Sequence, residues 1–195
     1  MHKKPQPRPI LAVLYVEDYN PNHPKRDTLI TKVANMTEDS GAGAYIFISY
    51  AHEDEDLKKE LDKYLKVLKR SSKVQVWQDR QLMAGQEWNE TIMSELSKAN
   101  IILLLVSVDF NASDFIWEKE LASAMQRHEA GTAHVVPIIL RKCDWHSMPY
   151  AKLQALPRNA TPVTEYPNRD AAFTEIALGI EKLVDYVNTK MKSGT

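Results

Sequence analysis

From residue 44 onward, short apolar runs alternate with longer segments in which apolar side chains recur every three or four positions. Short runs rich in β-branched residues are typical of buried strands, and the longer period is typical of amphipathic helices. Alternating strands and helices predict a parallel sheet with right-handed crossovers. The predicted strands are residues 45–50, 74–77, 101–108, 135–140 and 161–165. The predicted fold class is therefore α/β, with a five-stranded, doubly wound, flavodoxin-like parallel sheet and helices on both faces.

The pattern also predicts where some elements lie in the sheet. The run 101–108 lacks polar alternation until Ser107, as expected for a central strand covered on both faces. Pro137 has no amide hydrogen to donate, which favours an edge or irregular position for the strand 135–140. One helical face is predicted to carry Leu57, Leu61, Leu65 and Leu68, and another Phe173, Ile176, Ile180, Leu183, Val184 and Val187.

The chain before residue 44 has a different composition. Five prolines punctuate it, and Gly41 and Gly43 close it in the manner of a hinge. Residues 10–16 are apolar enough to form a strand. The predicted organisation is an N-terminal extension and linker over residues 1–43, one α/β domain over 44–190, and a tail over 191–195.

Charge and composition narrow the classes of function. The formal net charge is −1, and no basic stripe indicates a nucleic-acid surface. The single cysteine, Cys143, excludes an intrachain disulfide and a CxxC redox motif, which favours a cytoplasmic location. The longest apolar run, residues 101–106, is too short to cross a membrane. His52 has no cysteine or carboxylate at a metal-binding spacing, so no metal is expected.

Parallel α/β sheets bind ligands outside the carboxyl ends of their strands. This rule selects the segments 49–54, 79–88 and 109–120. Two side chains in these segments have two alternative roles each. Tyr50 either lines the cleft or caps the core, and Arg80 either pairs with a diphosphate or forms a surface ion pair with Asp79.

The same three segments resemble the signature motifs of Toll/interleukin-receptor (TIR) domains. Residues 45–54, YIFISYAHED, resemble box one of bacterial TIR domains, and WQDR at 77–80 with Gly85 and Trp88 resembles box two with its BB loop. Residues 113–121, SDFIWEKEL, resemble the αC motif that carries the catalytic glutamate of NAD-cleaving members. The motifs occur in the family's order, and the resemblance covers about three quarters of the chain.

The resemblance implies a catalytic role for Glu120, which immediately precedes Leu121 as the family's glutamate precedes its leucine. Many members carry tryptophan four positions before that glutamate, whereas this chain has Ile116 there and Trp117 one position later. Which aromatic ring stacks on the substrate therefore stays open. The residues expected to contact NAD are Ser49, Tyr50, Asp54, Arg80, Leu82, Gly85, Ile116 and Trp117.

One carboxylate suffices for this chemistry. The nicotinamide of NAD departs as a neutral molecule, so the reaction needs no general acid and depends on stabilising an oxocarbenium-like transition state. Helical spacing places Glu120 beside the apolar stripe, where desolvation would tune it. The alternative is that residues 118–120 form an ordinary solvated helix surface.

Two functions follow from the resemblance. The first is an NAD glycohydrolase or cyclase that releases nicotinamide and either ADP-ribose or a cyclic ADP-ribose-type signal, in prokaryotic anti-phage defence or cell suicide. NAD is then the substrate and no separate cofactor is expected. Self-assembly into a homo-oligomer through the BB loop and αC surfaces is expected to activate it, with a downstream effector or upstream sensor as a further partner. The alternative is a non-catalytic adaptor that binds other TIR domains.

Overall fold

Three buried strands form the body of the sheet in this computed structural model. They are β2 (Ala44–Ser49), β4 (Ile101–Val106) and β5 (His134–Ile139). All neighbouring strands run parallel, with β4 between β2 and β5. The structure describes residues 12–13, 43–71, 74–75, 88–114 and 120–193. The predicted parallel α/β architecture is confirmed over these residues.

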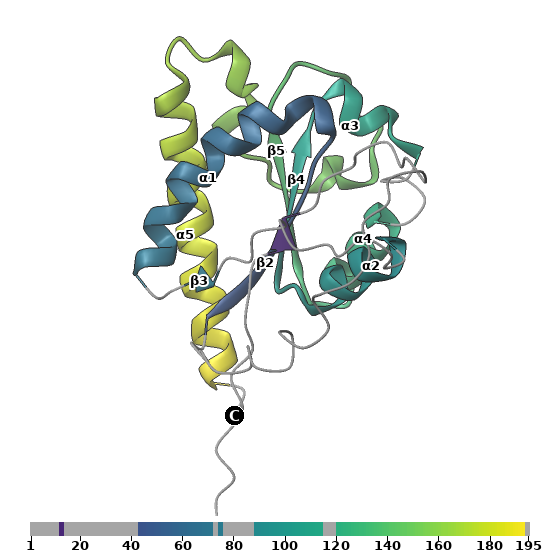
Figure 1. Cartoon of the computed structure of the whole chain (residues 1–195), viewed down its shortest axis with the longest axis vertical. Coiled ribbons are helices and arrows are strands. Elements are labelled where there is room, and N and C mark those ends of the chain that lie inside the picture. Colours follow the sequence, from purple (N-terminus) through teal and green to yellow (C-terminus); the bar gives the residue numbers. More distant parts are fainter. Residues whose placement is uncertain (1–11, 14–42, 72–73, 76–87, 115–119, 194–195) are drawn as a thin grey trace, which may run out of the picture.

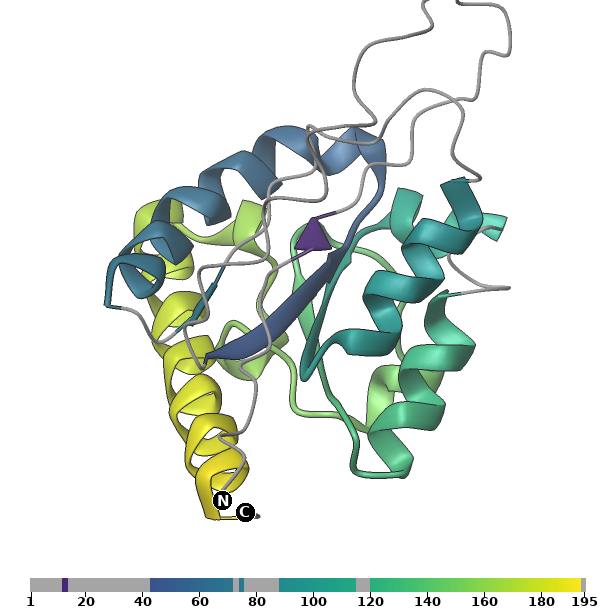
Figure 2. The same ribbon diagram turned by 60° about the horizontal axis from the view of Figure 1, so that its bottom comes forward.

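Helices cover both faces of this sheet (Figures 1 and 2). Helices α1 (Glu55–Arg70) and α5 (Arg169–Ser193) pack on one face. Helices α2 (Trp88–Lys98) and α4 (Ala122–Glu129) pack on the other. The two core clusters on opposite faces explain why β4 is apolar along its whole length, as the sequence predicts.

The predicted apolar stripes are buried where expected. On α1 the four predicted leucines lie in the core, and on α5 all the predicted positions do so except Leu183, which is partly buried. The α5 helix continues to Ser193 and therefore includes part of the predicted tail. A 3-10 turn, η2 (His52–Asp54), links β2 to α1.

Strand β2 assigns its side chains to the two faces in alternation. Ile46 and Ile48 contact the cluster under α1 and α5, whereas Tyr45 and Phe47 contact the cluster under α2 and α4. Successive side chains of a strand point to opposite faces, so Ser49 faces α2 and α4. This alternation determines which residues of the first motif can meet Glu120.

Two short strands pair with the same edge of β2. Strand β3 (Val74–Gln75) pairs with Ala44 and Tyr45, and β1 (Ala12–Val13) pairs with Phe47 and Ile48. Residues 12–13 lie within the predicted N-terminal extension, so part of that extension contributes to the sheet. The predicted domain boundaries stay predictions.

The prediction of a strand over residues 161–165 is wrong. This segment contains a 3-10 turn, η6 (Val163–Glu165), preceded by Pro162. Instead, Leu156 forms a single parallel bridge to Ile138 on the free side of β5. The bridge has backbone bonds on both sides of Leu156, to Pro137 O and from Ile139 N, each 2.8 Å. A flavodoxin-like sheet with five full strands therefore stays a prediction.

The third predicted strand is shorter than expected. It ends at Val106 because Ser107 caps the short helix α3 (Val108–Ala112), its hydroxyl accepting a hydrogen bond from Phe110 N. The prediction for Pro137 is confirmed, since β5 is the last strand in the sheet order. Two further 3-10 turns, η4 (Pro149–Lys152) and η5 (Arg158–Ala160), lie between β5 and α5.

Candidate active site

Ser49 and Glu120 contact each other on the face of the sheet that α2 and α4 cover. Ser49 is the last residue of β2, and Glu120 lies just before α4. The Ser49 hydroxyl donates a hydrogen bond of 2.5 Å to Glu120 Oε2. Both side chains belong to residues that are 2% exposed. The alternative that Glu120 lies on a solvated helix surface is therefore wrong.

The burial of Glu120 changes its acidity. Removing a carboxyl group from water penalises its ionised form, and the hydrogen bond from Ser49 partly offsets this effect. Together they raise the pKa of Glu120 from 4.5 to about 7. The side chain therefore titrates well above the range of an ordinary carboxyl, as is common for functional carboxylates in desolvated sites.

Tyr50 lies on the other side of the sheet. It is 1% exposed and belongs to the core cluster under α1 and α5. Its hydroxyl donates to Glu55 Oε2 over 2.8 Å, and the Lys58 ammonium lies 5.7 Å from its ring centroid. The structure thus places Tyr50 as the core cap that the sequence left open, and does not bring it to Glu120.

Asp54 belongs to a buried polar network at the carboxyl edge of the sheet. Its side chain is fully buried, and its two oxygens accept hydrogen bonds from Ser107 Oγ at 2.5 Å and Arg141 Nε at 2.7 Å. Arg141 also forms an ion pair with Asp109 through Nη2. Each oxygen of Asp54 thus accepts a hydrogen bond, and these contacts join the loops after β2, β4 and β5. A contact between Asp54 and NAD stays a prediction.

The rule that ligands bind outside the carboxyl ends of the strands predicts part of this network from the sequence. Asp109 follows β4 and was within a selected segment, whereas Arg141 follows β5 and was not. Applying the rule to the fourth predicted strand would have selected Arg141 as well. Ser107 carries no comparable signal, because a serine at a strand end is usually a cap.

The remaining predicted contact residues cannot be placed. Arg80, Leu82, Gly85, Ile116 and Trp117 lie outside the described residues. Their predicted roles toward NAD, and the question of which aromatic ring stacks on it, stay predictions.

The comparison with known families supplies the identification. The family described as TIR domain matches residues 46–176, which is more than half of the chain. The chain belongs to the TIR domain family. The matched range contains Ser49, Asp54, Glu120 and Arg141, so the contacts above all lie within the TIR domain.

One relative extends the comparison. The TIR domain is similar to the Sinorhizobium fredii (strain NBRC 101917 / NGR234) protein named "Uncharacterized protein y4lF", with 44% identity over 137 residues. The match covers 70% of this chain and 42% of the relative, so the chain spans less than half of the relative's length. No solved structure matches the chain.

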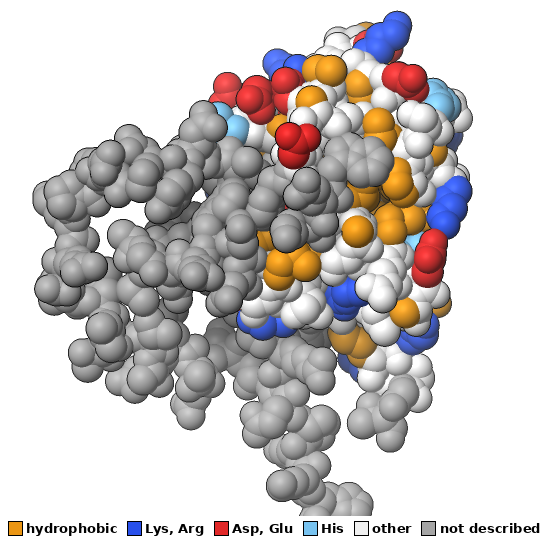
Figure 3. Space-filling model, turned by 90° about the vertical axis from the view of Figure 1, so that its right-hand side faces the viewer, with side chains coloured by type: hydrophobic (Ala, Val, Ile, Leu, Met, Phe, Trp, Pro, Cys, Tyr) orange, Lys and Arg blue, Asp and Glu red, His pale blue; other side chains and the backbone are white. Residues whose placement is uncertain are grey.

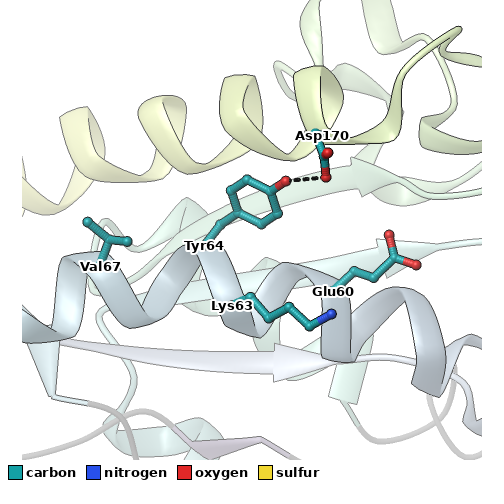
Figure 4. A pocket seen from close by; sticks show the side chains of 5 residues that line it. All are labelled: Glu60, Lys63, Tyr64, Val67 and Asp170. Carbon is teal, nitrogen blue, oxygen red and sulfur yellow. Dashed lines mark hydrogen bonds between the residues drawn. The ribbon is translucent and has the colours of Figure 1, made fainter.

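A surface groove lies elsewhere, between the first turns of α5 and the middle of α1 (Figure 4). Tyr64 and Asp170 line it, and the Tyr64 hydroxyl donates to Asp170 Oδ1 over 2.6 Å. This hydrogen bond, with a smaller contribution from burial, raises the pKa of Tyr64 to about 12. The groove lies on the α1 and α5 face, opposite Glu120, so it is separate from the candidate active site of the TIR domain.

The described part of the TIR domain shows neither a metal cluster nor a membrane helix. Within that part, no three or more His, Cys, Asp or Glu side chains gather closely enough to hold a metal ion. None of the helices described there combines the length and apolar character of a membrane span. On the side of α2 and α4, acidic and basic side chains are interspersed among the described surface residues (Figure 3).

Proposed function

We propose that this TIR domain cleaves NAD at the bond between nicotinamide and ribose, with Glu120 as the catalytic carboxylate. The TIR family includes both NAD-cleaving enzymes and adaptors. The observation that carries the proposal is the buried contact between Ser49 and Glu120 at the carboxyl end of β2. This is the edge at which parallel α/β sheets bind ligands, and both residues belong to motifs typical of the family.

The chemistry requires a carboxylate and little else. As the bond to nicotinamide lengthens, positive charge develops on the ribose, and a nearby negative charge in a poorly solvated site stabilises it strongly. Ser49 holds one oxygen of Glu120, which limits the rotation of the carboxylate and lowers its pKa relative to burial alone. The ionised form of Glu120 is the active one, so turnover increases as the pH rises through the pKa of Glu120.

Burial supports a second part of the proposal, that the activity is conditional. Glu120 is almost closed to solvent, so a ribose reaches it only after a rearrangement around the end of β2. We propose that self-assembly through the BB loop and αC surfaces drives this rearrangement and completes the site. Nicotinamide leaves as a neutral molecule, and the ribose carbon is then attacked either by water, which gives ADP-ribose, or by another atom of the same molecule, which gives a cyclic ADP-ribose-type signal; a proton is released in both cases. The biological role proposed is prokaryotic anti-phage defence or cell suicide, triggered by a sensor or read by an effector.

A second candidate is a non-catalytic adaptor that binds other TIR domains. The same burial of Glu120 favours it, because a carboxyl with a raised pKa and a serine donor is also a satisfied core group. The two functions differ in whether NAD is consumed, and both depend on assembly.

Nicotinamide release from NAD tests the proposal directly. Concentrated wild-type protein, with and without a crowding agent, is compared with Glu120→Gln and with the control Glu129→Gln, which neutralises an exposed carboxylate near the end of α4. We expect release by wild type and Glu129→Gln and a loss of at least about 100-fold in Glu120→Gln. Equal release by all three proteins would remove Glu120 from the mechanism.

Measuring self-association together with NAD consumption distinguishes the adaptor from the enzyme. Replacing Gly85 with a bulky residue is expected to reduce both self-association and nicotinamide release, while thermal unfolding stays close to that of wild type. Assembly by wild type without any NAD consumption would support the adaptor.

A further inference from the structure

The outer edge of β5 carries backbone groups that point away from β4. Successive residues of a parallel strand direct their backbone bonds to opposite sides. His134 N bonds to Asn100 O on the side of β4, so the amides of Val135 and Ile139 point outward. Pro137 between them has no amide hydrogen. Outward amides of this kind are open to water or to a further strand unless another group pairs with them.

Two different groups pair with the outward amides of β5. Near the carboxyl end of the strand, Ile139 N donates to Leu156 O over 2.8 Å. Near the amino end, Val135 N donates to Nδ1 of the His128 ring over 3.2 Å. A backbone carbonyl does not titrate, whereas an imidazole nitrogen accepts a hydrogen bond only while it carries no proton. The pairing of Val135 is therefore conditional on the protonation of His128.

His128 lies in the last turn of α4, so its bond to Val135 holds the end of this helix against β5. Other contacts close the turn between the two elements. Gly131 N donates to His128 O over 3.0 Å, and the Arg127 guanidinium donates to Thr132 O over 3.1 Å. These acceptors are backbone carbonyls. Loss of the bond from Val135 to His128 would therefore release the edge of β5 while the turn stays closed.

A second histidine next to His128 disfavours a positive charge at this place. The ring of His134 lies edge-on to that of His128, with centroids 6.5 Å apart. Tyr186 of α5 lies edge-on to His134 at 5.7 Å. Burial lowers the pKa of His134, and the charges of His128 and Lys190 lower it further. A proton on one imidazole thus places a charge beside the other imidazole and near the Lys190 ammonium.

The charged side chains next to His128 in α4 offset this effect little. Arg127 is itself a cation. Glu129 is exposed and forms an ion pair with Lys152 of η4 over 2.8 Å. The bond from Lys152 lowers the pKa of Glu129, and the charge of His128 contributes less. Solvent screens the attraction between an exposed carboxylate and a neighbouring imidazolium.

We propose that His128 is an acid-sensitive lock that holds the end of α4 to the outer edge of β5. While the ring is neutral, Nδ1 accepts the Val135 amide hydrogen. Once Nδ1 is protonated, two donors face each other, so the ring turns away and the amide of Val135 opens to solvent. Histidine ordinarily titrates near pH 6.5, so the lock opens as the pH falls from about 7.5 to about 5.5. The lock goes beyond the proposed function and does not depend on it.

Hydrogen exchange of single amides in the full chain tests the lock. NMR measures the protection of Val135 and, as an internal reference, of Ile139 at about pH 7.5 and about pH 5.5, with each rate corrected for the intrinsic rate at that pH. In wild type, the protection of Val135 should fall about fivefold to tenfold at the lower pH, as the loss of one hydrogen bond implies. The protection of Ile139 should stay unchanged.

Three variants decide whether His128 is responsible. In His128→Asn, the amide oxygen replaces Nδ1 as an acceptor that does not titrate, so Val135 should stay protected at both pH values. His128→Phe keeps a ring without an acceptor and should leave Val135 poorly protected at both. The control His146→Asn replaces an exposed histidine after β5 and should behave as wild type.

Two outcomes would overturn the proposal. One is protection of Val135 in wild type that does not change with pH. The other is an equal fall in wild type and in His128→Asn. If His128→Phe does not fold, the comparison of wild type with His128→Asn still decides. The measurement uses no NAD, so a protein that leaves NAD intact would refute the proposed function without affecting this test.

Discussion

Ser49 donates its hydroxyl hydrogen to Oε2 of Glu120, and these residues stand 71 positions apart in the sequence. The serine is placed by the end of a buried strand and the glutamate by the start of a helix on the same face of the sheet. The contact brings together the first and third TIR motifs of this chain. Burial raises the pKa of the proposed catalytic group, and this contact partly offsets that rise.

The pH profile of nicotinamide release is expected to move in Ser49→Ala. The hydrogen bond stabilises the ionised form of Glu120, so its loss raises the pKa above about 7. The acid limb of kcat/KM should shift upward by about one pH unit, since a hydrogen bond to a charged group contributes about 1.5–3 kcal/mol before relaxation. Ser97→Ala, which alters an exposed serine bonded to Ser94 O, is the control. An unchanged acid limb in Ser49→Ala would separate that limb from Glu120.

The stability of the fold is expected to depend on pH through Glu120. Its folded pKa of about 7 lies above the ordinary value of 4.5, so the folded state holds this proton more tightly than the unfolded state does. Its contribution to stability is greatest below pH 4.5 and is lost as the pH rises to about 7. Glu120→Gln has no carboxyl to titrate at this position. Its free energy of unfolding should therefore rise relative to that of wild type by about 3 kcal/mol as the pH increases from 4.5 to about 7.

Urea unfolding of Glu120→Gln and wild type from pH 4.5 to pH 8 measures this difference. Glu53→Gln, which replaces an exposed side chain, provides the baseline. A constant difference between Glu120→Gln and wild type across this range would mean that the Glu120 carboxyl is solvated in the folded protein.

Breaking the ion pair between Asp54 and Arg141 is expected to destabilise the fold. Arg141→Met leaves the buried Asp54 carboxylate with Ser107 as its remaining described donor, at a cost of about 3 kcal/mol after allowance for the partial exposure of Arg141. The double variant Asp54→Asn with Arg141→Met removes the orphaned charge and should recover part of this loss. Chemical denaturation measures all three proteins. A cost below about 1 kcal/mol for Arg141→Met would indicate a solvated, weak pair.

Gly179 of α5 is expected to be required because the helix approaches Leu156 closely at this position. A Cβ at this position would lie 2.9 Å from both Cδ1 and Cδ2 of Leu156, which packs against the core. Alanine stabilises a helix interior by about 1 kcal/mol relative to glycine, but overpacking costs about 1–3 kcal/mol. Gly179→Ala should therefore destabilise the protein by about 1 kcal/mol in thermal unfolding. In a Leu156→Ala background the same change should become stabilising, and an unchanged sign there would place the strain elsewhere.

Much of this protein could be predicted from its sequence, because the governing interactions are local. The leucine stripe of α1 and the apolar run of β4 follow from the spacing of hydrophobic side chains, which burial then satisfies. The motif around Glu120 was recognisable because neighbouring residues carry it. The strand predicted at residues 161–165 failed because a short run containing Pro162 has no periodicity strong enough to separate a strand from a 3-10 turn.

The sequence by itself determined the parallel α/β class, the helical faces and the choice of Glu120 as the candidate carboxylate. Only the tertiary structure decided that Ser49 meets Glu120 while Tyr50 enters the opposite core, and that Arg141 joins Asp54 to Asp109. These contacts link residues far apart in the chain. The pairing of strands and the packing of helices bring them within hydrogen-bond distance, and local spacing carries no information about that distance.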